Sequence, residues 1–241
     1  PPRSPLFPYT TLFRSWRVFA DADALVRALA DALCAEAAAA IAARGAFQLV
    51  LAGGGTPRAL YAELARRGAG DARWHIWYGD ERCLPANDPE RNSAMAEAAW
   101  LTASAIPEEQ RWPIPAEYGA GEGAAVYADW LARVGEFDVV LLGMGEDGHT
   151  ASLFPGHDWG AQADGPDVLA VRDAPKPPPE RVSLSAARLN RGAKLWVVVT
   201  GAGKRDALRR WRRGEAVPVA AIQGRQETVA WLDAAAWQTG D

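Results

Sequence analysis

Short apolar runs alternate along this chain with longer segments in which apolar residues recur every three or four positions. The runs predict strands at residues 16–20, 47–52, 74–78, 137–142 and 194–200. The segments between them predict helices at residues 21–43, 56–67, 92–102, 123–134 and 204–213. This alternation predicts one α/β domain of the doubly wound, Rossmann-like kind, in which a mostly parallel sheet has helices on both faces.

Polar and glycine residues mark where these elements begin and end. Asp21 is a suitable N-cap for the first helix, and Gly45 is placed to end it. Thr56 is predicted to be the N-cap of the second helix, with Pro57 as its first residue. Further strands are predicted at residues 168–171, 181–186, 218–222 and 228–232, the last two closing the sheet.

Composition narrows the class of protein. Hydrophobic residues make up 49% of the 241 positions and the formal net charge is −4, without a basic face for nucleic acid. No apolar run approaches the roughly 18 residues needed to cross a bilayer, so no membrane partner is expected. The two cysteines, Cys34 and Cys83, make no disulfide framework and fit a reducing cytoplasm. The oligomeric state is not encoded in any such pattern, and a monomer is favoured.

The first residues are treated apart from the domain. Residues 6–15 read LFPYTTLFRS, which looks like the translation of a sequencing-library adapter. The stretch lacks the continuous apolar region of a signal peptide. We therefore expect residues 1–15 to be a non-native leader and residues 16–241 to be the domain.

The most informative segment, residues 143–156, reads GMGEDGHTASLFPG and follows the buried strand 137–142. It turns on three glycines and then contains residues that can start a helix. In open α/β sheets, ligand chemistry lies at such strand ends. His149 stands there between acids and a hydroxyl, and an imidazole titrates near working pH. Of the other histidines, His75 lies within a strand and is expected to be structural, while His157 lies in a loop beyond the segment.

A second glycine turn, residues 53–57 (GGGTP), lies between a strand and a helix. Free backbone N–H groups at a helix N-terminus attract an anion, and glycines allow it to approach closely. Gly54, Gly55 and Thr56 are therefore candidate phosphate ligands. The turn lacks the Lys-Ser/Thr pair of a P-loop and the spacing of a dinucleotide fingerprint, so it favours a single terminal phosphate over a nucleotide.

Four ordered blocks of this sequence resemble the glucosamine-6-phosphate isomerase/6-phosphogluconolactonase family. The blocks are residues 51–57 (LAGGGTP); residues 79–82 (GDER) with Pro85, Asp88, Asn92 and Ser93; residues 143–156; and residues 181–184 (RVSL) with 201–204 (GAGK). The resemblance extends from about Trp16 to Leu232. Four blocks in order are far more specific than one glycine motif.

The lactonase branch of this family implies hydrolysis of 6-phospho-D-glucono-1,5-lactone to 6-phospho-D-gluconate, the second step of the oxidative pentose phosphate route, here in bacterial cytoplasm. It implies neither a cofactor nor a metal. His149 is the expected base, and Asp80 and Arg82 match residues that line the family's site. Asp147 either orients the imidazole or only shapes the turn.

The resemblance also implies further residues of the phosphate site. Arg181 and Lys204 are expected to complete the phosphate pocket with the glycine turn, because arginine grips phosphate bidentately and lysine supplies a compact charge. Lys176 lies near Arg181 in the sequence and is an alternative to it.

Two other functions share parts of this sequence pattern. An aminosugar-6-phosphate deaminase/isomerase would share the fold, but deaminases resemble GHIAFNEP where this chain reads GHTASLFP at residues 148–155. The glutamate that partners the histidine in ring opening is absent here. A catalytically inactive sugar-phosphate sensor would carry a DNA-binding helix-turn-helix before the sugar domain, and almost nothing precedes Trp16.

Overall fold

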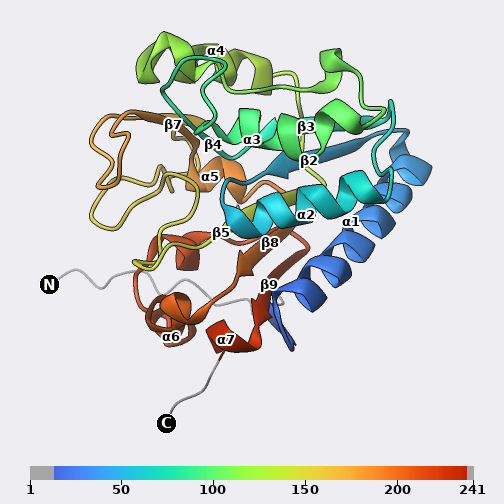
Figure 1. Ribbon diagram of the computed structural model, residues 1–241. Coiled ribbons are helices and arrows are strands. Elements are labelled where there is room, and N and C mark those ends of the chain that lie inside the picture. Colours follow the sequence, from blue (N-terminus) through green and yellow to red (C-terminus); the bar gives the residue numbers. More distant parts are fainter. Residues whose placement is uncertain (1–13, 238–241) are drawn as a thin grey trace, which may run out of the picture.

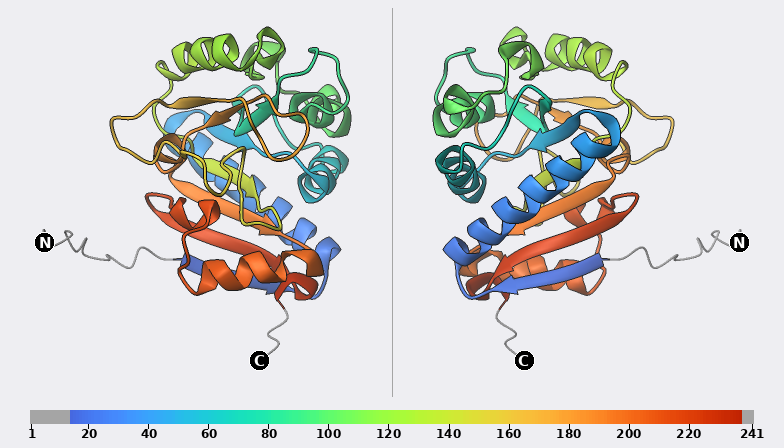
Figure 2. Two further views of the ribbon diagram at one scale, coloured as in Figure 1. Left: turned by 90° about the vertical axis from the view of Figure 1, so that its left-hand side faces the viewer. Right: turned by 90° about the vertical axis from the view of Figure 1, so that its right-hand side faces the viewer.

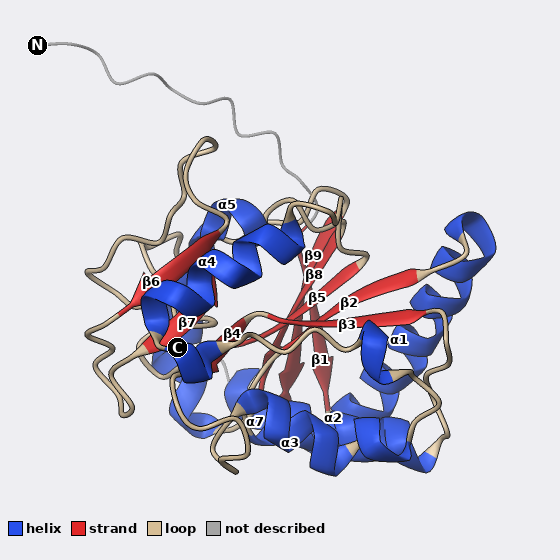
Figure 3. Ribbon diagram, turned by 90° about the horizontal axis from the view of Figure 1, so that it is seen from above, coloured by secondary structure: helices blue, strands red, loops and turns tan. Residues whose placement is uncertain are grey.

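Six parallel strands form the main sheet, in the order β1-β9-β8-β5-β2-β3 (Figure 1). The structure is a computed structural model that describes residues 14–237 of the 241-residue chain. Figure 3 shows α2 and α3 on one side of the strands and α4 and α5 on the other. The predicted doubly wound α/β domain is therefore confirmed.

The strands are β1 (Arg14–Phe19), β2 (Phe47–Leu51), β3 (Trp74–Tyr78), β4 (Asp80–Arg82), β5 (Val139–Gly143), β6 (Val168–Val171), β7 (Arg181–Leu184), β8 (Lys194–Val199) and β9 (Glu227–Asp233). The α-helices are α1 (Ala22–Arg44), α2 (Gly55–Arg66), α3 (Asn92–Ala99), α4 (Ala120–Leu131), α5 (Ala186–Leu189), α6 (Arg205–Arg212) and α7 (Ala234–Trp237).

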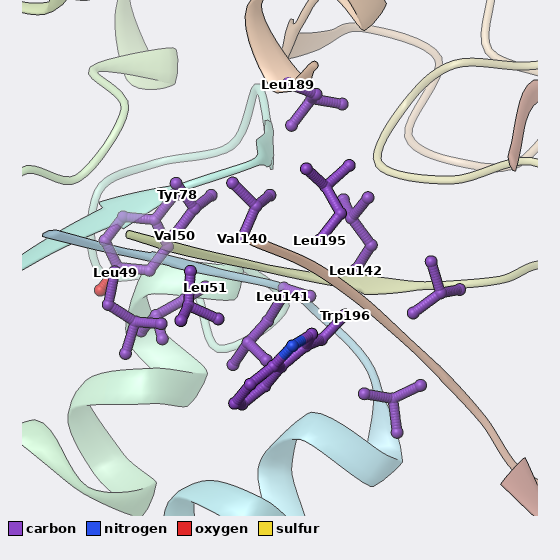
Figure 4. Close-up of a cluster of buried hydrophobic side chains, with 14 of the residues drawn as sticks. Leu49, Val50, Leu51, Tyr78, Val140, Leu141, Leu142, Leu189, Leu195 and Trp196 are labelled. Atoms are coloured by element: carbon purple, nitrogen blue, oxygen red, sulfur yellow. The ribbon is translucent and has the colours of Figure 1, made fainter. Parts of the chain in front are cut away.

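The central strands carry the core because both faces of the sheet are covered. In Figure 4 alternate side chains of β2 and β5 point to opposite sides, with Val140 and Leu142 on one side and Leu141 on the other. All of these side chains are at most 1% exposed. Continuous apolar runs are typical of parallel strands buried on both faces. The run that predicted β5 therefore indicated its central place.

Helix α1 has the capping residues that the sequence predicted. The Asp21 carboxylate accepts a hydrogen bond from the Ala24 N–H at 2.7 Å, and Gly45 ends the helix with a φ of 79°. A left-handed residue at this point favours glycine because it has no Cβ to clash. Strand β1, at the edge of the sheet beside β9 (Figure 2), begins at Arg14 rather than at Trp16.

The proposed leader, residues 1–15, lies mostly outside the described residues. Only Arg14 and Ser15 are described, and they pair with Thr228 and Val229 in β9. Within residues 14–237, no helix combines the length and apolar character that a bilayer crossing requires.

A second, antiparallel sheet of three strands was not predicted as a separate unit. Its order is β4-β7-β6, and α4 packs against it. Strand β4 consists of three charged residues (DER) and follows β3 after Gly79 alone, so no apolar run marks it as a strand. The small sheet places Arg82 opposite Arg181.

Three local predictions were wrong. Helix α2 begins at Gly55 with Gly54 as its N-cap, so Thr56 lies within the first turn and does not cap it. Residues 218–221 form a 3-10 helix instead of a strand, because Pro218 fixes its own φ and has no N–H for a sheet ladder. No helix follows His149, since the chain continues through turns in which Ala151 has a φ of 48°.

Candidate active site

A cavity of about 350 Å³ opens at the carboxyl ends of β2, β3 and β5, where ligands bind in open α/β sheets. Most of the predicted site residues meet there. Its walls include Gly53, Gly54, Asp80, Arg82, Asn92, His149, Phe154, Lys176, Arg181 and Lys204. The histidine and the glycine turn, which are almost 100 residues apart in sequence, thus face one space.

Asp147 holds the imidazole of His149. The Asp147 Oδ1 atom lies 2.5 Å from His149 Nδ1 and also accepts the His149 backbone N–H at 3.1 Å. Asp147 itself is not in the cavity wall, so it acts on a ligand only through the histidine. A carboxylate on Nδ1 fixes the tautomer with the proton on Nδ1, which leaves Nε2 as the basic nitrogen.

The tight turn that carries this pair depends on Gly145. A Cβ on Gly145 would lie 2.0 Å from His149 Nδ1 and 2.6 Å from Asp147 Oδ1, so only glycine leaves room for the ring. The Gly145 N–H also donates to the His149 carbonyl at 2.8 Å. The glycines of the sequence motif therefore fold the chain back beneath the imidazole.

Burial and charge set the protonation of the pair. Burial lowers the pKa of His149 below its usual value, and the hydrogen bond that its ring donates to the Asp147 carboxylate opposes this change without reversing it. The pKa of Asp147 is also lowered: burial would raise it, but the hydrogen bonds from His149 outweigh that effect. At neutral pH the site therefore holds a neutral imidazole beside an ionised carboxylate, as a general base requires.

Asp80 is buried and firmly held at the start of β4. Its Oδ2 accepts the Ser152 hydroxyl at 2.6 Å, and its Oδ1 accepts the Asn92 amide at 3.2 Å. Asn92 also packs over Gly53, where a Cβ would lie 2.0 Å from the Asn92 Oδ1. One amide thus connects Asp80 to the glycine turn.

The side chains of β4 alternate in direction, as an extended backbone predicts. Glu81 points away from the cavity, is fully buried and accepts the N–H groups of Asn92 and Ser93 at 2.7 and 2.8 Å. These are free donors at the N-terminus of α3, so the carboxylate caps that helix. Arg82 lines the cavity and donates one Nη1 hydrogen bond to the Glu90 carbonyl.

The glycine turn places its first two residues in the cavity wall. Gly53 and Gly54 line the cavity, whereas Gly55 and Thr56 belong to the first turn of α2 and lie outside the wall. The Thr56 hydroxyl is 2.6 Å from that of Thr200, at the end of β8. The N-terminus of α2 still faces this edge, where its dipole favours an anion.

The cationic side chains of the cavity differ in their surroundings. Burial lowers the pKa of Lys204, and the charge of Lys176 lowers it further, although Glu146 opposes both. Arg181 is 6% exposed and donates to the carbonyls of residues 176–178 at 3.0–3.1 Å. The sequence predicted the presence of Arg181 in the cavity but not these hydrogen bonds.

Three cavity or supporting residues received no role from the sequence. Asn92 and Ser152 hold Asp80, and the ring of Phe154 lies 4.9 Å from that of His149. Asn92 stands in the GDER block and the other two in the histidine block, so their places in the motifs were the available signal. Their roles depend on which strand ends meet, which a linear pattern does not give.

The remaining candidate side chains lie outside the cavity wall. Neither His75 in β3 nor His157, whose Nδ1 is 3.5 Å from Asp173, lines the cavity. Cys83 is a free thiol whose pKa burial raises to about 11, which disfavours the reactive thiolate. Among residues 14–237 we find no cluster of His, Cys, Asp and Glu that could hold a metal ion.

Fold and site together define an α/β protein with a carboxylate-oriented histidine and several cations around one cavity, an arrangement suited to acid–base chemistry on a small anionic ligand. Residues 20–231 match the family described as glucosamine-6-phosphate isomerases/6-phosphogluconolactonase. This chain belongs to that family.

Individual relatives agree with the family match. The chain is 40% identical over 237 residues to the 6-phosphogluconolactonase of Mycobacterium tuberculosis, covering 91% of this chain and 95% of the relative. The crystal structure of the 6-phosphogluconolactonase from Thermotoga maritima superposes with a TM-score of 0.84 at 22% identity, covering 92% and 100% of the two chains. A monomeric glucosamine-6-phosphate deaminase also superposes, with a TM-score of 0.77 at 18% identity over 92% and 98%. The last two likenesses concern the fold alone.

Proposed function

We propose that this protein hydrolyses 6-phospho-D-glucono-1,5-lactone to 6-phospho-D-gluconate, without a metal or cofactor. The observation that carries the proposal is the hydrogen bond between His149 Nδ1 and Asp147 Oδ1, at 2.5 Å. The same imidazole lines the cavity together with Gly54 and Lys204. Such a ring has one nitrogen left to take a proton from water. The cavity also offers cations and a helix N-terminus for a phosphate at the far end of a six-carbon substrate.

The proposed reaction follows from these groups. Nε2 of His149 removes a proton from water, whose oxygen attacks the lactone carbonyl carbon and forms a tetrahedral oxyanion. Arg82, which lines the cavity, is the proposed stabiliser of that charge. The C–O bond to the ring oxygen then breaks, and the imidazolium returns its proton to that oxygen. Asp147 stabilises the imidazolium between these two transfers.

The sugar end of the substrate is assigned to fixed polar groups. Asp80 is oriented by Ser152 and Asn92, so its carboxylate is suited to accept hydrogen bonds from sugar hydroxyls. Lys204 and the N-terminus of α2 are proposed to bind the phosphate, with Gly54 allowing close approach. Gly55 and Thr56 would contribute through their backbone N–H groups in the first helical turn.

Hydrolysis is favoured over deamination and isomerisation by the residues after His149. The segment 150–155 reads TASLFP and supplies hydroxyl and apolar groups, not the glutamate that would partner the histidine in ring opening. Ser152 is instead engaged with Asp80, and Phe154 packs beside the imidazole. An inactive sensor is disfavoured by the intact set of Asp80, Arg82 and His149 in one cavity.

A direct assay tests the function. Glucose-6-phosphate dehydrogenase generates the lactone in place, and its loss is followed with and without the protein, against the spontaneous hydrolysis rate. We expect acceleration that persists in EDTA. A parallel assay for ammonia release from glucosamine 6-phosphate should show none. Unchanged lactone decay with folded protein would contradict the proposal, and ammonia release would favour the deaminase.

We further propose a monomeric protein of the bacterial cytoplasm that acts without nucleic acid or membrane. The two cysteines are free, and the formal net charge of −4 gives no general attraction for nucleic acid or anionic lipid. Size-exclusion chromatography with light scattering checks the oligomeric state, for which a mass near 25.8 kDa is expected.

A further inference from the structure

Lysine is rare in this chain and concentrated at the cavity. Only Lys176, Lys194 and Lys204 occur among the 26 basic residues, and all the others are arginines. Lys176 and Lys204 both line the cavity. Lys194 lies at the opposite, amino end of β8 and pairs with Glu36 at 2.5 Å. Two of the three flexible, compact cations therefore face the proposed ligand.

Most hydrogen-bond donors of the Arg181 guanidinium are occupied by carbonyls of the loop that carries Lys176. Its Nε donates to the Pro178 carbonyl at 3.1 Å, and its Nη2 donates to the Lys176 and Pro177 carbonyls at 3.0 Å each. A guanidinium offers a phosphate two bidentate edges, Nε with Nη2 and Nη1 with Nη2. Both edges include Nη2, which already donates to two carbonyls here. Arg181 therefore cannot grip a phosphate bidentately in this conformation.

The backbone of Arg181 is held in place by the small sheet. Arg181 belongs to β7, the middle strand of the small sheet, with β4 on one side and β6 on the other. Its guanidinium also lies over the Phe154 ring, 5.7 Å from the ring centroid. A residue held in this way is suited to shape the loop at residues 176–178, which has no regular structure of its own.

From this geometry we propose that Lys176 binds the substrate phosphate together with Lys204, and that Arg181 is a positioning residue that holds the Lys176 loop over the cavity. The inference rests on the proposed function for the identity of the ligand. It replaces the direct contact that the sequence suggested for Arg181 with an indirect one.

The charges at the cavity agree with this assignment. Burial is the main cause that lowers the pKa of Lys204, and the positive charge of Lys176 lowers this pKa further. The same charge also acts to lower the pKa of His149, whose pKa burial lowers most. Two ammonium groups that line one cavity repel each other and so favour an anion between them. A phosphate bound there would relieve this repulsion, because it supplies the counter-charge.

The small number of lysines allows a test by NMR that needs no turnover. In protein labelled with 13C at the lysine Cε, each lysine gives its own signal, assigned by the variants Lys176→Met, Lys194→Met and Lys204→Met. We expect 6-phosphogluconate to shift the Lys176 and Lys204 signals and to leave Lys194 unchanged, and gluconate to shift neither at the same concentration. If only the Lys204 signal shifts and the Lys176 signal does not, this proposal is overturned and the proposed function stays intact. If neither signal shifts, the result counts against this proposal and against the proposed function.

A double-mutant cycle tests the positioning role. Lys176→Met should weaken 6-phosphogluconate binding by about tenfold to hundredfold, as expected for one charged hydrogen bond, and Lys176→Arg should restore part of it. Arg181→Lys keeps the charge but cannot reach three carbonyls, so it should weaken binding when Lys176 is present and add little to Lys176→Met. Equal losses from Arg181→Lys in both backgrounds would overturn the positioning role.

If Arg181→Lys is poorly folded, the Lys176 variants still test the phosphate contact, because Lys176 is exposed and its variants should melt like the wild type. Lys194→Met is the matched control and should bind with unchanged affinity. Wild-type affinity in Lys176→Met would then overturn the proposal by itself.

Discussion

His149 and Asp147 are two residues apart in sequence, and their side chains meet at 2.5 Å between Nδ1 and Oδ1. Gly145 makes this contact possible by leaving room for the ring. The imidazole is therefore oriented by its own loop and not by a distant element. Orientation by a carboxylate fixes which nitrogen can act as the base.

Replacing His149 by alanine should abolish most of the catalysis and spare binding. We expect kcat to fall by about 10²–10⁴, the usual contribution of a general base, while the affinity for 6-phosphogluconate stays near that of the wild type. Lactonase kinetics and calorimetric titration measure the two effects. His157→Ala, outside the cavity wall, is the matched control. Full activity in His149→Ala would exclude this residue as the base.

The pH dependence should report the lowered pKa of His149. The base is active when neutral, so kcat/KM should be constant at higher pH and fall only below the ordinary histidine value of about 6.5. Asp147→Asn removes the group that raises this pKa, so the acidic limb should move to still lower pH while kcat falls. The pH profiles of both proteins, corrected for spontaneous hydrolysis, test this. An acidic limb that moves upward in Asp147→Asn would contradict the assigned pair.

Lys204→Ala should affect substrate binding more than the chemical step. Loss of one charged hydrogen bond to phosphate corresponds to a rise in KM of about tenfold to hundredfold with a much smaller change in kcat. Steady-state kinetics check the division, and Lys194→Ala serves as the control. A fall in kcat at unchanged KM would place Lys204 in the reaction itself.

Gly53→Ala should destabilise the protein through one identified clash. The new Cβ would lie 2.0 Å from the Asn92 Oδ1, so Asn92 must move away from Asp80. We expect a loss of about 1–3 kcal/mol in the free energy of unfolding, measured in urea, together with reduced activity. Gly55→Ala, where nothing lies within 4 Å of the new Cβ, is the control and should cost little. The Gly53→Ala/Asn92→Ala double variant should lose less stability than the sum of the two single variants.

Local signals in the sequence predicted much of this molecule. The caps of α1 at Asp21 and Gly45, the buried run of β5 and the turn that carries His149 are all encoded within a few neighbouring residues. The family resemblance brought Asp80, Arg82 and Lys204 into consideration, and they line one cavity.

What the sequence did not predict depends on long-range contacts. Thr56 is a good cap by propensity, but the preceding glycines let α2 start two residues earlier, and the Thr56 hydroxyl meets that of Thr200 instead. The small sheet pairs β4 with β7, about 100 residues further along the chain, which no periodicity reveals. The hydrogen bonds of Arg181 likewise depend on the path of the loop at residues 176–178.

The loop that carries His149 is also connected to the small sheet by hydrogen bonds. The Ser152 N–H donates to the Ser183 hydroxyl at 3.2 Å, and the Ser152 hydroxyl donates to Asp80 at 2.6 Å. Ser183 is fully buried in β7 and is absent from the cavity wall. A substitution at Ser183 can therefore shift the loop that carries His149 as a whole, without changing any residue of the cavity wall.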